Sequence, residues 1–191
     1  MSLHQRLADI GLAPRSAETG TFLLVEGAAR TALQARLEFH DEPHRMLWYV
    51  DAAVQFERLA PTLFQVSPNG RLDAWLGENF DAIALSVVHA RLNHDALCRQ
   101  LRRFGKHEDE SGRYFLRLGD PASLHLYVAS LSRAPARVAQ FFDHGRIEGI
   151  YFRDPGLGLS RQVQALFEQP LDGADRDGCL IWRSIPNGEA G

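Results

Sequence analysis

The sequence predicts an α/β fold with a central mixed sheet flanked by helices and a smaller helical C-terminal lobe. Short apolar runs that suit buried strands recur at residues 21–26, 46–50 and 83–88. Segments with apolar residues three and four positions apart, which is the spacing of an amphipathic helix, separate these runs. Helical spacing then dominates residues 121–145, and this predicts the smaller lobe.

Length and composition limit the classes of function. The chain has 191 residues, 45% of them hydrophobic and 24% charged, which suits one domain with a real core or two small lobes. The formal net charge of -3 gives no global reason to bind nucleic acid. No stretch is long and apolar enough to span a membrane, and residues 1–7 lack the pattern of an export signal. We therefore expect a cytoplasmic protein with no membrane or nucleic-acid partner.

The pattern divides the chain into three parts. Residues 1–20 combine a short amphipathic segment with glycine and proline and are expected to be an N-terminal appendage. The main domain, residues 21–153, comprises an α/β lobe over about 21–120 and the helical lobe over about 121–145. Residues 154–191 follow a strong turn signal and are expected to form a C-terminal extension of short strand or helix pieces.

Three strands of the main domain have clear signals. Thr21–Val25 is continuously apolar and predicts a strand that is buried on both faces. Pro61–Val66 predicts another strand, with proline at the first position, where no ladder donor is needed. The run at residues 81–88 is the most apolar of the chain, and Asn93 after it is placed to cap a helix.

The stretch Gly112–Pro121 combines a strand signal with a helix start. Apolar and aromatic residues alternate in it, which predicts a strand of the central sheet over 113–118. Asp120 can accept the first free backbone N–H groups of a helix, and Pro121 suits the first helical position. Arg117 carries a charge on this strand, and we interpret it as the structural partner of Asp120 rather than as a contact for another molecule.

Potential metal ligands do not form a recognisable set. His40 and His44 flank the densest cluster, but Pro43 prevents the regular helical turn that would place both histidines on one face. A polar loop is the favoured interpretation, and no metal or cofactor is expected. Cys98 and Cys179 lie outside zinc or disulfide spacing and are expected to be reduced thiols.

Candidate catalytic residues lack partners as well. His89, His94 and Asp120 lie near predicted strand ends, where catalytic groups gather in α/β proteins, but no nucleophile is paired with them. Ser86 lies inside an apolar strand and is expected to be a buried, hydrogen-bonded hydroxyl. The residues therefore predict no catalytic site.

Five short motifs in order resemble the type VI secretion effector adaptor or chaperone family, known as domain of unknown function 4123. The family's Asp-Gly-Ala strand end, Pro-Tyr-Leu strand start, Trp-Gly-Ile-x-x-Ser strand, His-Leu-Arg-Arg helix and Phe-Arg-Phe-Tyr-Asp-Pro turn correspond to 26–28, 61–63, 81–86, 100–103 and 116–121. Order and spacing agree over roughly residues 21–153, although Glu26, Thr62 and Gln100 are among the departures. The motif positions expected to be structural are Gly27, Pro61, Ser86, Leu101, Arg117, Asp120 and Pro121.

The resemblance implies a non-enzymatic protein that binds a toxic effector and helps to load it onto the VgrG spike before secretion. Basic residues on the helix after Asn93, and apolar residues beyond what one sheet face requires, are candidates for contacting that partner, although simple coverage of the sheet explains the apolar residues equally well. The candidates are Arg102, Arg103, Leu124, Tyr127, Phe141 and Phe142.

Two alternative functions stay open. A small cytoplasmic α/β enzyme would use His89, His94 or Asp120 at strand ends, and an immunity protein would neutralise a toxin instead of delivering it. A spike gene upstream and a toxin gene downstream would favour the adaptor, whereas a metabolic operon would favour the enzyme.

Overall fold

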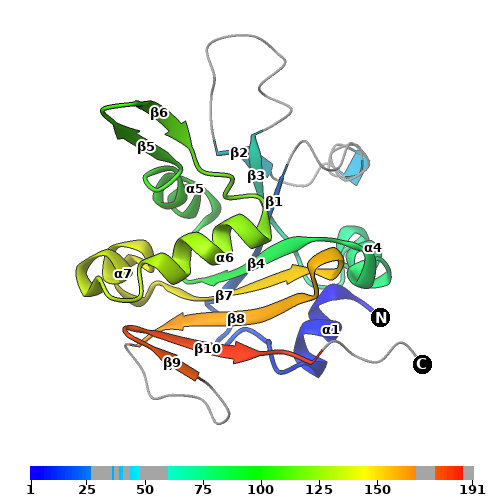
Figure 1. Cartoon of the computed structure of the whole chain (residues 1–191). Helices are drawn as coiled ribbons and strands as arrows, with labels where there is room; N and C mark the ends of the chain where they lie inside the picture. The colour runs from blue at the N-terminus through cyan, green and yellow to red at the C-terminus, as the bar shows by residue number, and fades with distance from the viewer. Residues whose placement is uncertain (27–35, 37–38, 41–43, 48–59, 167–174, 187–191) are drawn as a thin grey trace.

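The computed structural model describes residues 1–26, 36, 39–40, 44–47, 60–166 and 175–186. Its centre is an eight-stranded sheet in the order β2-β3-β1-β4-β7-β8-β10-β9 (Figure 1). The α/β class is confirmed, but every neighbouring pair of these strands is antiparallel, where the sequence predicted a mixed sheet. Tight connections such as the single turn between β7 and β8 return the chain alongside the strand that it has just left, and this requires antiparallel pairing.

The elements have the following bounds. The strands of the sheet are β1 Gly20–Glu26, β2 His44–Met46, β3 Pro61–Gln65, β4 Leu85–Ala90, β7 Ile147–Asp154, β8 Leu159–Ala165, β9 Asp175–Asp177 and β10 Leu180–Ser184. A separate hairpin consists of β5 Lys106–Asp109 and β6 Gly112–Phe115. The α-helices are α1 Leu3–Asp9, α4 Arg71–Glu78, α5 His94–Arg102, α6 Pro121–Ser130 and α7 Pro135–Phe141, and single turns are η2 Phe80–Ala82, η3 Asp143–Gly145 and η4 Pro155–Leu157.

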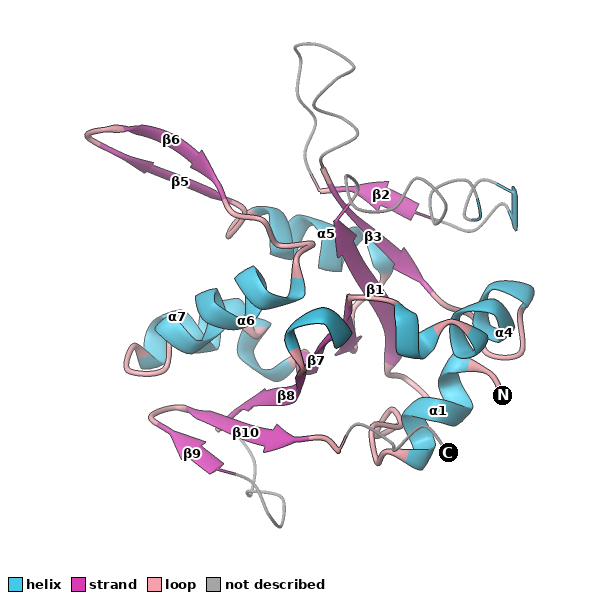
Figure 2. Ribbon diagram, turned by 45° about the vertical axis from the view of Figure 1, so that its right-hand side comes forward, coloured by secondary structure: helices cyan, strands magenta, loops and turns pink. Residues whose placement is uncertain are grey.

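The sheet is buried on both faces because its central strands supply two separate cores. On β1, Phe22 and Leu24 join one core, while Leu23 and Val25 join the other. Helices α5, α6 and α7 cover the first face, and α1 and α4 cover the second (Figure 2). Alternate side chains of a strand point to opposite faces, so a continuous apolar run is what such a strand requires.

Most predicted strands of the first half are confirmed. β1, β3 and β4 lie within the predicted runs or overlap them, and all six residues of β4 are buried. The run predicted at 46–50 corresponds to β2, which ends at Met46, and residues 48–50 lie outside the described part of the chain.

The strand predicted over 113–118 is not part of the central sheet. β6 ends at Phe115 and pairs with β5, and the resulting hairpin projects from the body of the molecule beyond α5 (Figures 1 and 2). The side chains of Tyr114 and Phe115 are exposed, whereas Leu118 is fully buried, so the alternating residues do not form one buried face of a sheet strand. β5 is made of polar residues and therefore gave no apolar signal of its own.

The first helix and the last described strands are integrated into the fold. Helix α1 packs against α4, and its Leu3 and Leu7 are fully buried in the second core. Residues 159–184, where an extension was expected, contribute β8, β9 and β10 to the same sheet. Helix α6 of the expected helical lobe packs directly on β7. Among the described residues, no helix is both long and apolar enough to cross a membrane.

Gly119 allows the turn before α6 to touch the end of β1. A Cβ atom at Gly119 would lie 2.5 Å from the carbonyl oxygen of Val25 and 2.6 Å from the amide nitrogen of Glu26. Both neighbours are backbone atoms of a buried strand, so neither can move without disturbing the sheet. The turn therefore requires glycine for close approach.

We expect Gly119→Ala to lower the free energy of unfolding by about 1–3 kcal/mol, because the added methyl group forces the turn away from β1. Urea unfolding monitored by circular dichroism measures this effect. Gly156→Ala is the matched control, since a Cβ atom there meets only the Asp154 carboxylate, at 3.3 Å. Equal stability of the Gly119→Ala variant and the wild type would contradict the close approach.

Candidate functional site

The hairpin of β5 and β6 is the most prominent exposed apolar feature among the described residues. Glu110 and Ser111 form its turn, and the register pairs Lys106 with Phe115. Tyr114 is 46% exposed and Phe115 is 49% exposed, although both are large and apolar. The Lys106 ammonium lies 5.8 Å from the centre of the Phe115 ring, which is a cation–π distance. The hairpin thus presents aromatic surface beside positive charge.

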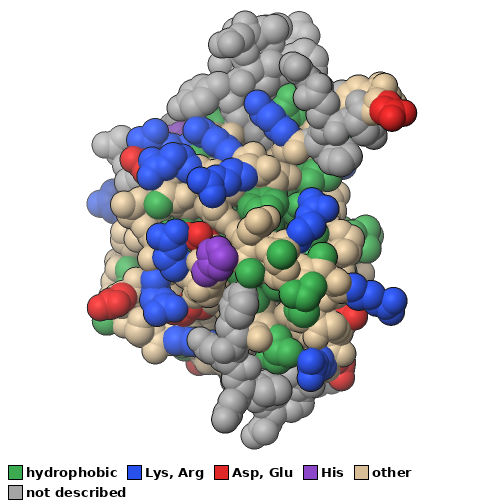
Figure 3. Space-filling view, turned by 90° about the vertical axis from the view of Figure 1, so that its left-hand side faces the viewer, with side chains coloured by type: hydrophobic (Ala, Val, Ile, Leu, Met, Phe, Trp, Pro, Cys, Tyr) green, Lys and Arg blue, Asp and Glu red, His purple; other side chains and the backbone are tan. Residues whose placement is uncertain are grey.

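Helix α5 anchors the base of the hairpin and supplies further positive charge. Its N-terminus is capped as predicted, because the Asn93 side chain accepts a 2.9 Å hydrogen bond from the amide of Ala96. The buried side of α5 packs into the core, whereas Arg99 and Arg103 are exposed. Where the chain leaves the hairpin, the amide of Leu116 donates a 2.9 Å hydrogen bond to the carbonyl of Gly105. Figure 3 shows that Lys and Arg side chains gather in groups on this side of the molecule.

The two basic candidates have different environments. The guanidinium of Arg102 donates to the carbonyl oxygens of Leu47 at 2.7 Å and Met46 at 2.9 Å. Arg102 therefore ties α5 to the end of β2 and has a structural role. Arg103 is exposed, and its nearest described acceptor is the side chain of Gln100 at 3.5 Å. Of the pair, Arg103 has the guanidinium that a partner could contact.

The apolar candidates lie mainly in the core, which corrects their assignment to a partner surface. Leu124, Phe141 and Phe142 are completely buried, and the two phenylalanine rings contact each other edge to face with centroids 5.4 Å apart. Tyr127 is partly buried against Phe141, and burial raises the pKa of its hydroxyl although Arg137 opposes this. Coverage of the sheet thus explains these side chains. The exposed apolar residue of α6 is Leu126, at 68%.

The predicted ion pair between Arg117 and Asp120 is confirmed, and it includes a third residue. Arg117 Nη2 lies 3.4 Å from Asp120 Oδ2, and Arg117 Nε lies 3.5 Å from Glu26 Oε1 at the end of β1. Burial raises the pKa of Glu26, and the nearby Arg117 opposes that rise. Asp120 also caps α6, because its Oδ1 accepts a 2.7 Å hydrogen bond from the amide of Ser123, and Pro121 is the first helical residue as predicted.

The remaining family-motif positions lie in the sheet and its core. Pro61 begins β3 as expected, and Leu101 is fully buried in the first core. Ser86 is buried near the start of β4, but its hydroxyl has no hydrogen-bond partner among the described residues, where a bonded hydroxyl was expected. Gly27 lies outside the described residues.

The histidines proposed for an enzyme occupy separate places in the structure. His94 is the first residue of α5, and its Nε2 lies 3.0 Å from the carbonyl oxygen of Leu63. His89 is buried in β4, and burial lowers its pKa to about 4, with His4 and Arg15 adding to the effect. His44 is an exposed residue of β2. Within the part of the chain that the structure describes, no group of three or more His, Cys, Asp or Glu side chains could hold a metal ion.

Sequence reasoning missed the exposed aromatic pair, because it assigned Tyr114 and Phe115 to a strand of the central sheet. One signal was available. A polar segment at 106–109, two turn residues and Gly112 precede the aromatics, and this is the pattern of a short hairpin. A hairpin that consists of only two strands has no sheet face on which to bury large side chains, so they remain exposed.

Two substitutions at Asp120 separate its cap from its charge. Asp120→Ala removes the cap of α6, and we expect it to lower the free energy of unfolding by about 1 kcal/mol. Asp120→Asn keeps a capping oxygen and removes only the pairing with the largely exposed Arg117, so its expected cost is below about 0.5 kcal/mol. Denaturant unfolding of both variants measures the difference. An equal loss in both would show that the ion pair, and not the cap, holds this turn.

Buried neutral His89 predicts acid sensitivity. The unfolded chain protonates His89 near its ordinary pKa of about 6.5, whereas the folded chain resists protonation down to about 4, so stability is complete above the first value and is lost as the pH falls between the two. Between about pH 7 and about pH 5 we expect His89 to account for a loss of about 2 kcal/mol. Urea unfolding should show this loss in the wild type and in the exposed control His44→Gln, and a smaller one in His89→Gln. Identical pH dependence in all three proteins would contradict the assignment.

Comparison with known proteins gives one match. A family model described as Domain of unknown function (DUF4123) matches residues 21–137, from β1 into α7. No curated protein and no solved structure matched the chain. The matched segment includes the hairpin, α5, the Arg117 turn and the start of α6. Because the match spans more than half of the chain and agrees with the motifs in the sequence, this protein belongs to the DUF4123 family.

Proposed function

We propose that this protein is a non-enzymatic adaptor or chaperone that acts in the cytoplasm, binds a type VI secretion effector and helps to load it onto the VgrG spike. The proposal rests on the motif resemblance, to which the family match over residues 21–137 adds support. The structural observation that carries it is the projecting hairpin, which exposes Tyr114 and Phe115.

The chemistry of the hairpin suits a protein partner. Large aromatic side chains that become buried on binding are frequent centres of protein interfaces, and Arg contributes often as well. Tyr114 and Phe115 would supply such a centre, while Lys106 beside Phe115 and Arg103 at the end of α5 would favour an acidic rim on the effector. The expected partner surface is therefore an apolar groove with carboxylates at its edge.

Positions of the strand-end residues favour an adaptor over the alternative enzyme. His94 contacts a backbone carbonyl of β3, and Asp120 caps α6 and pairs with Arg117. Each of these side chains therefore has a structural partner of its own. His89 lies within β4, and neither His94 nor Asp120 belongs to that strand.

We expect the double variant Tyr114→Ser and Phe115→Ser to reduce effector retention by about tenfold or more while the melting temperature stays near that of the wild type, because the two side chains contribute little to the core. Co-expression with the products of the neighbouring genes, followed by affinity purification, measures retention. Leu157→Ser is the matched control, since Leu157 is 69% exposed but lies on η4, away from the hairpin in sequence.

Two outcomes would contradict the proposal in different ways. Full retention by the double variant would show that the effector binds elsewhere on the protein. A wild-type protein that retains neither neighbouring product would contradict the adaptor function itself. An immunity protein would be recognised by a separate assay, because its expression alone would protect cells from the toxin.

A further inference from the structure

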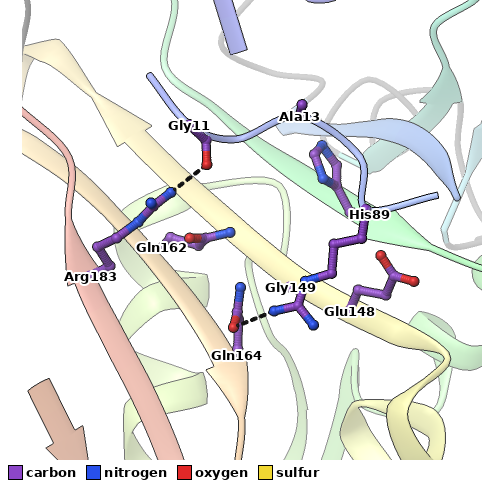
Figure 4. Close-up of a pocket in the computed structure, with 9 residues that line it drawn as sticks. Gly11, Ala13, His89, Glu148, Gly149, Gln162, Gln164 and Arg183 are labelled. Carbon is purple, nitrogen blue, oxygen red and sulfur yellow. Dashed lines mark hydrogen bonds between the residues drawn. The ribbon is translucent and has the colours of Figure 1, made fainter. Parts of the chain in front are cut away.

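A polar cavity of about 180 Å³ lies at the side of the sheet that carries α1. The segment after α1, residues 11–15, forms one wall, and strands β4, β7, β8 and β10 supply the rest. Figure 4 shows the side chains of Arg183 and Gln162 on one side of this cavity and those of His89 and Glu148 on the other. The hairpin contributes nothing to it, so the cavity is independent of the proposed effector surface.

Strand alternation explains why this end of the sheet is polar. Val163 of β8 and Trp182 of β10 point into the first core, so their neighbours Gln162, Gln164 and Arg183 point to the opposite face. That face is apolar where α1 and α4 cover it and polar beside them. Arg183 is held in place by a 2.7 Å hydrogen bond to the carbonyl of Gly11.

Four polar atoms around the cavity are buried without a hydrogen-bond partner among the described residues. They are His89 Nε2, Glu148 Oε2, Gln162 Oε1 and Arg183 Nε. The Glu148 side chain is only 8% exposed and His89 only 9%. Buried polar groups are nearly always hydrogen-bonded, so four unbonded atoms around one space indicate a polar occupant.

The charges favour an anion that also carries a donor group. Glu148 Oε1 forms an ion pair with Arg91 Nε at 3.2 Å and accepts a hydrogen bond from the Thr19 hydroxyl at 3.0 Å, so its charge is largely balanced from outside the cavity. The guanidinium of Arg183 then places positive charge at the lining. Glu148 Oε2 and Gln162 Oε1 are acceptors, and they require N–H or O–H groups on the occupant.

The floor of the cavity is kept open by Gly149. A Cβ atom at this position would lie 3.3 Å from Cγ of Gln164 and 3.5 Å from Nε2 of Gln162, and also 3.2 Å from the carbonyl oxygen of Val163. Any side chain at Gly149 would therefore occupy space between the two glutamines. The volume corresponds to about six water molecules in the liquid, which suits a small molecule.

We propose that this cavity binds a small α-hydroxy or α-amino carboxylate, whose carboxylate accepts from Arg183 and whose hydroxyl or amino group donates to Glu148 or Gln162. The arrangement places donors and acceptors on opposite walls, as such a ligand requires. The proposal does not depend on effector binding.

Four probes of similar size test the proposal on the full-length protein. L-Lactate and L-alanine have both required groups, propionate lacks the hydroxyl, and propylene glycol lacks the carboxylate. Isothermal titration gives the affinity, and backbone amide shifts of Gly149 and Gln164 in NMR spectra locate the ligand. We expect lactate or alanine to bind more tightly than propionate, with no binding of propylene glycol.

Variants connect the binding to the cavity. Arg183→Gln should weaken binding by about tenfold or more, because a charge-assisted contact is lost. Arg176→Gln, on the exposed strand β9, should bind as the wild type does. Because Arg183 also holds Gly11, Gly149→Ala is a second test and should weaken binding by filling the floor.

Three results would overturn the proposal. The first is the absence of binding by every carboxylate, which would mean that water alone satisfies the buried atoms. The second is binding of inorganic phosphate without binding of lactate or alanine. The third is unchanged affinity in both Arg183→Gln and Gly149→Ala.

Discussion

Burial of both faces of the central strands is the constraint on which the rest of the structure depends. β1, β4 and β7 lie next to one another in the sheet, and their side chains enter a core on each side of it. Apolar surface removed from water contributes about 25 cal/mol per Å², so a sheet of this kind is stable only if helices cover both faces. This requirement places α5, α6 and α7 on one side and α1 and α4 on the other.

Coverage of the central strands on both faces limits where function can reside. With both faces occupied along the central strands, surface for a partner has to lie at the margins of the fold. The projecting hairpin is one such margin, because it leaves the body after α5 and exposes Tyr114 and Phe115. The polar end of the second face is another, because the segment after α1 crosses it and encloses a cavity.

The turn between the hairpin and α6 connects the exposed hairpin to the buried sheet. Gly119 approaches the backbone of β1, Arg117 pairs with Glu26 at the end of that strand, and Asp120 caps α6. One short segment therefore fixes the orientation of the hairpin base, the end of the central strand and a covering helix. Its residues have structural partners within the chain, which agrees with their place among the family motifs.

The sequence predicted those parts of the site that depend on local chemistry. Asp120 and Asn93 were identified as caps because a side-chain oxygen beside free amide groups needs no distant residue. The placement of the other candidates was decided by distant contacts. Apolar residues that cover a sheet and apolar residues that face a partner have the same pattern in sequence. Leu124, Phe141 and Phe142 proved to cover the sheet, because they are buried against β7 and its neighbours.

By itself, the sequence determined the α/β class, the buried strands β1, β3 and β4 and the helices that Asn93 and Asp120 cap, because apolar periodicity and capping are properties of neighbouring residues. Only the tertiary structure decided the strand order and direction, the separation of the β5–β6 hairpin from the sheet and the joining of residues 159–184 to it. It also brought Arg15, His89, Glu148 and Arg183 around one cavity. Strand pairing of this kind joins residues far apart in the chain, and no local pattern records which strand lies next to which.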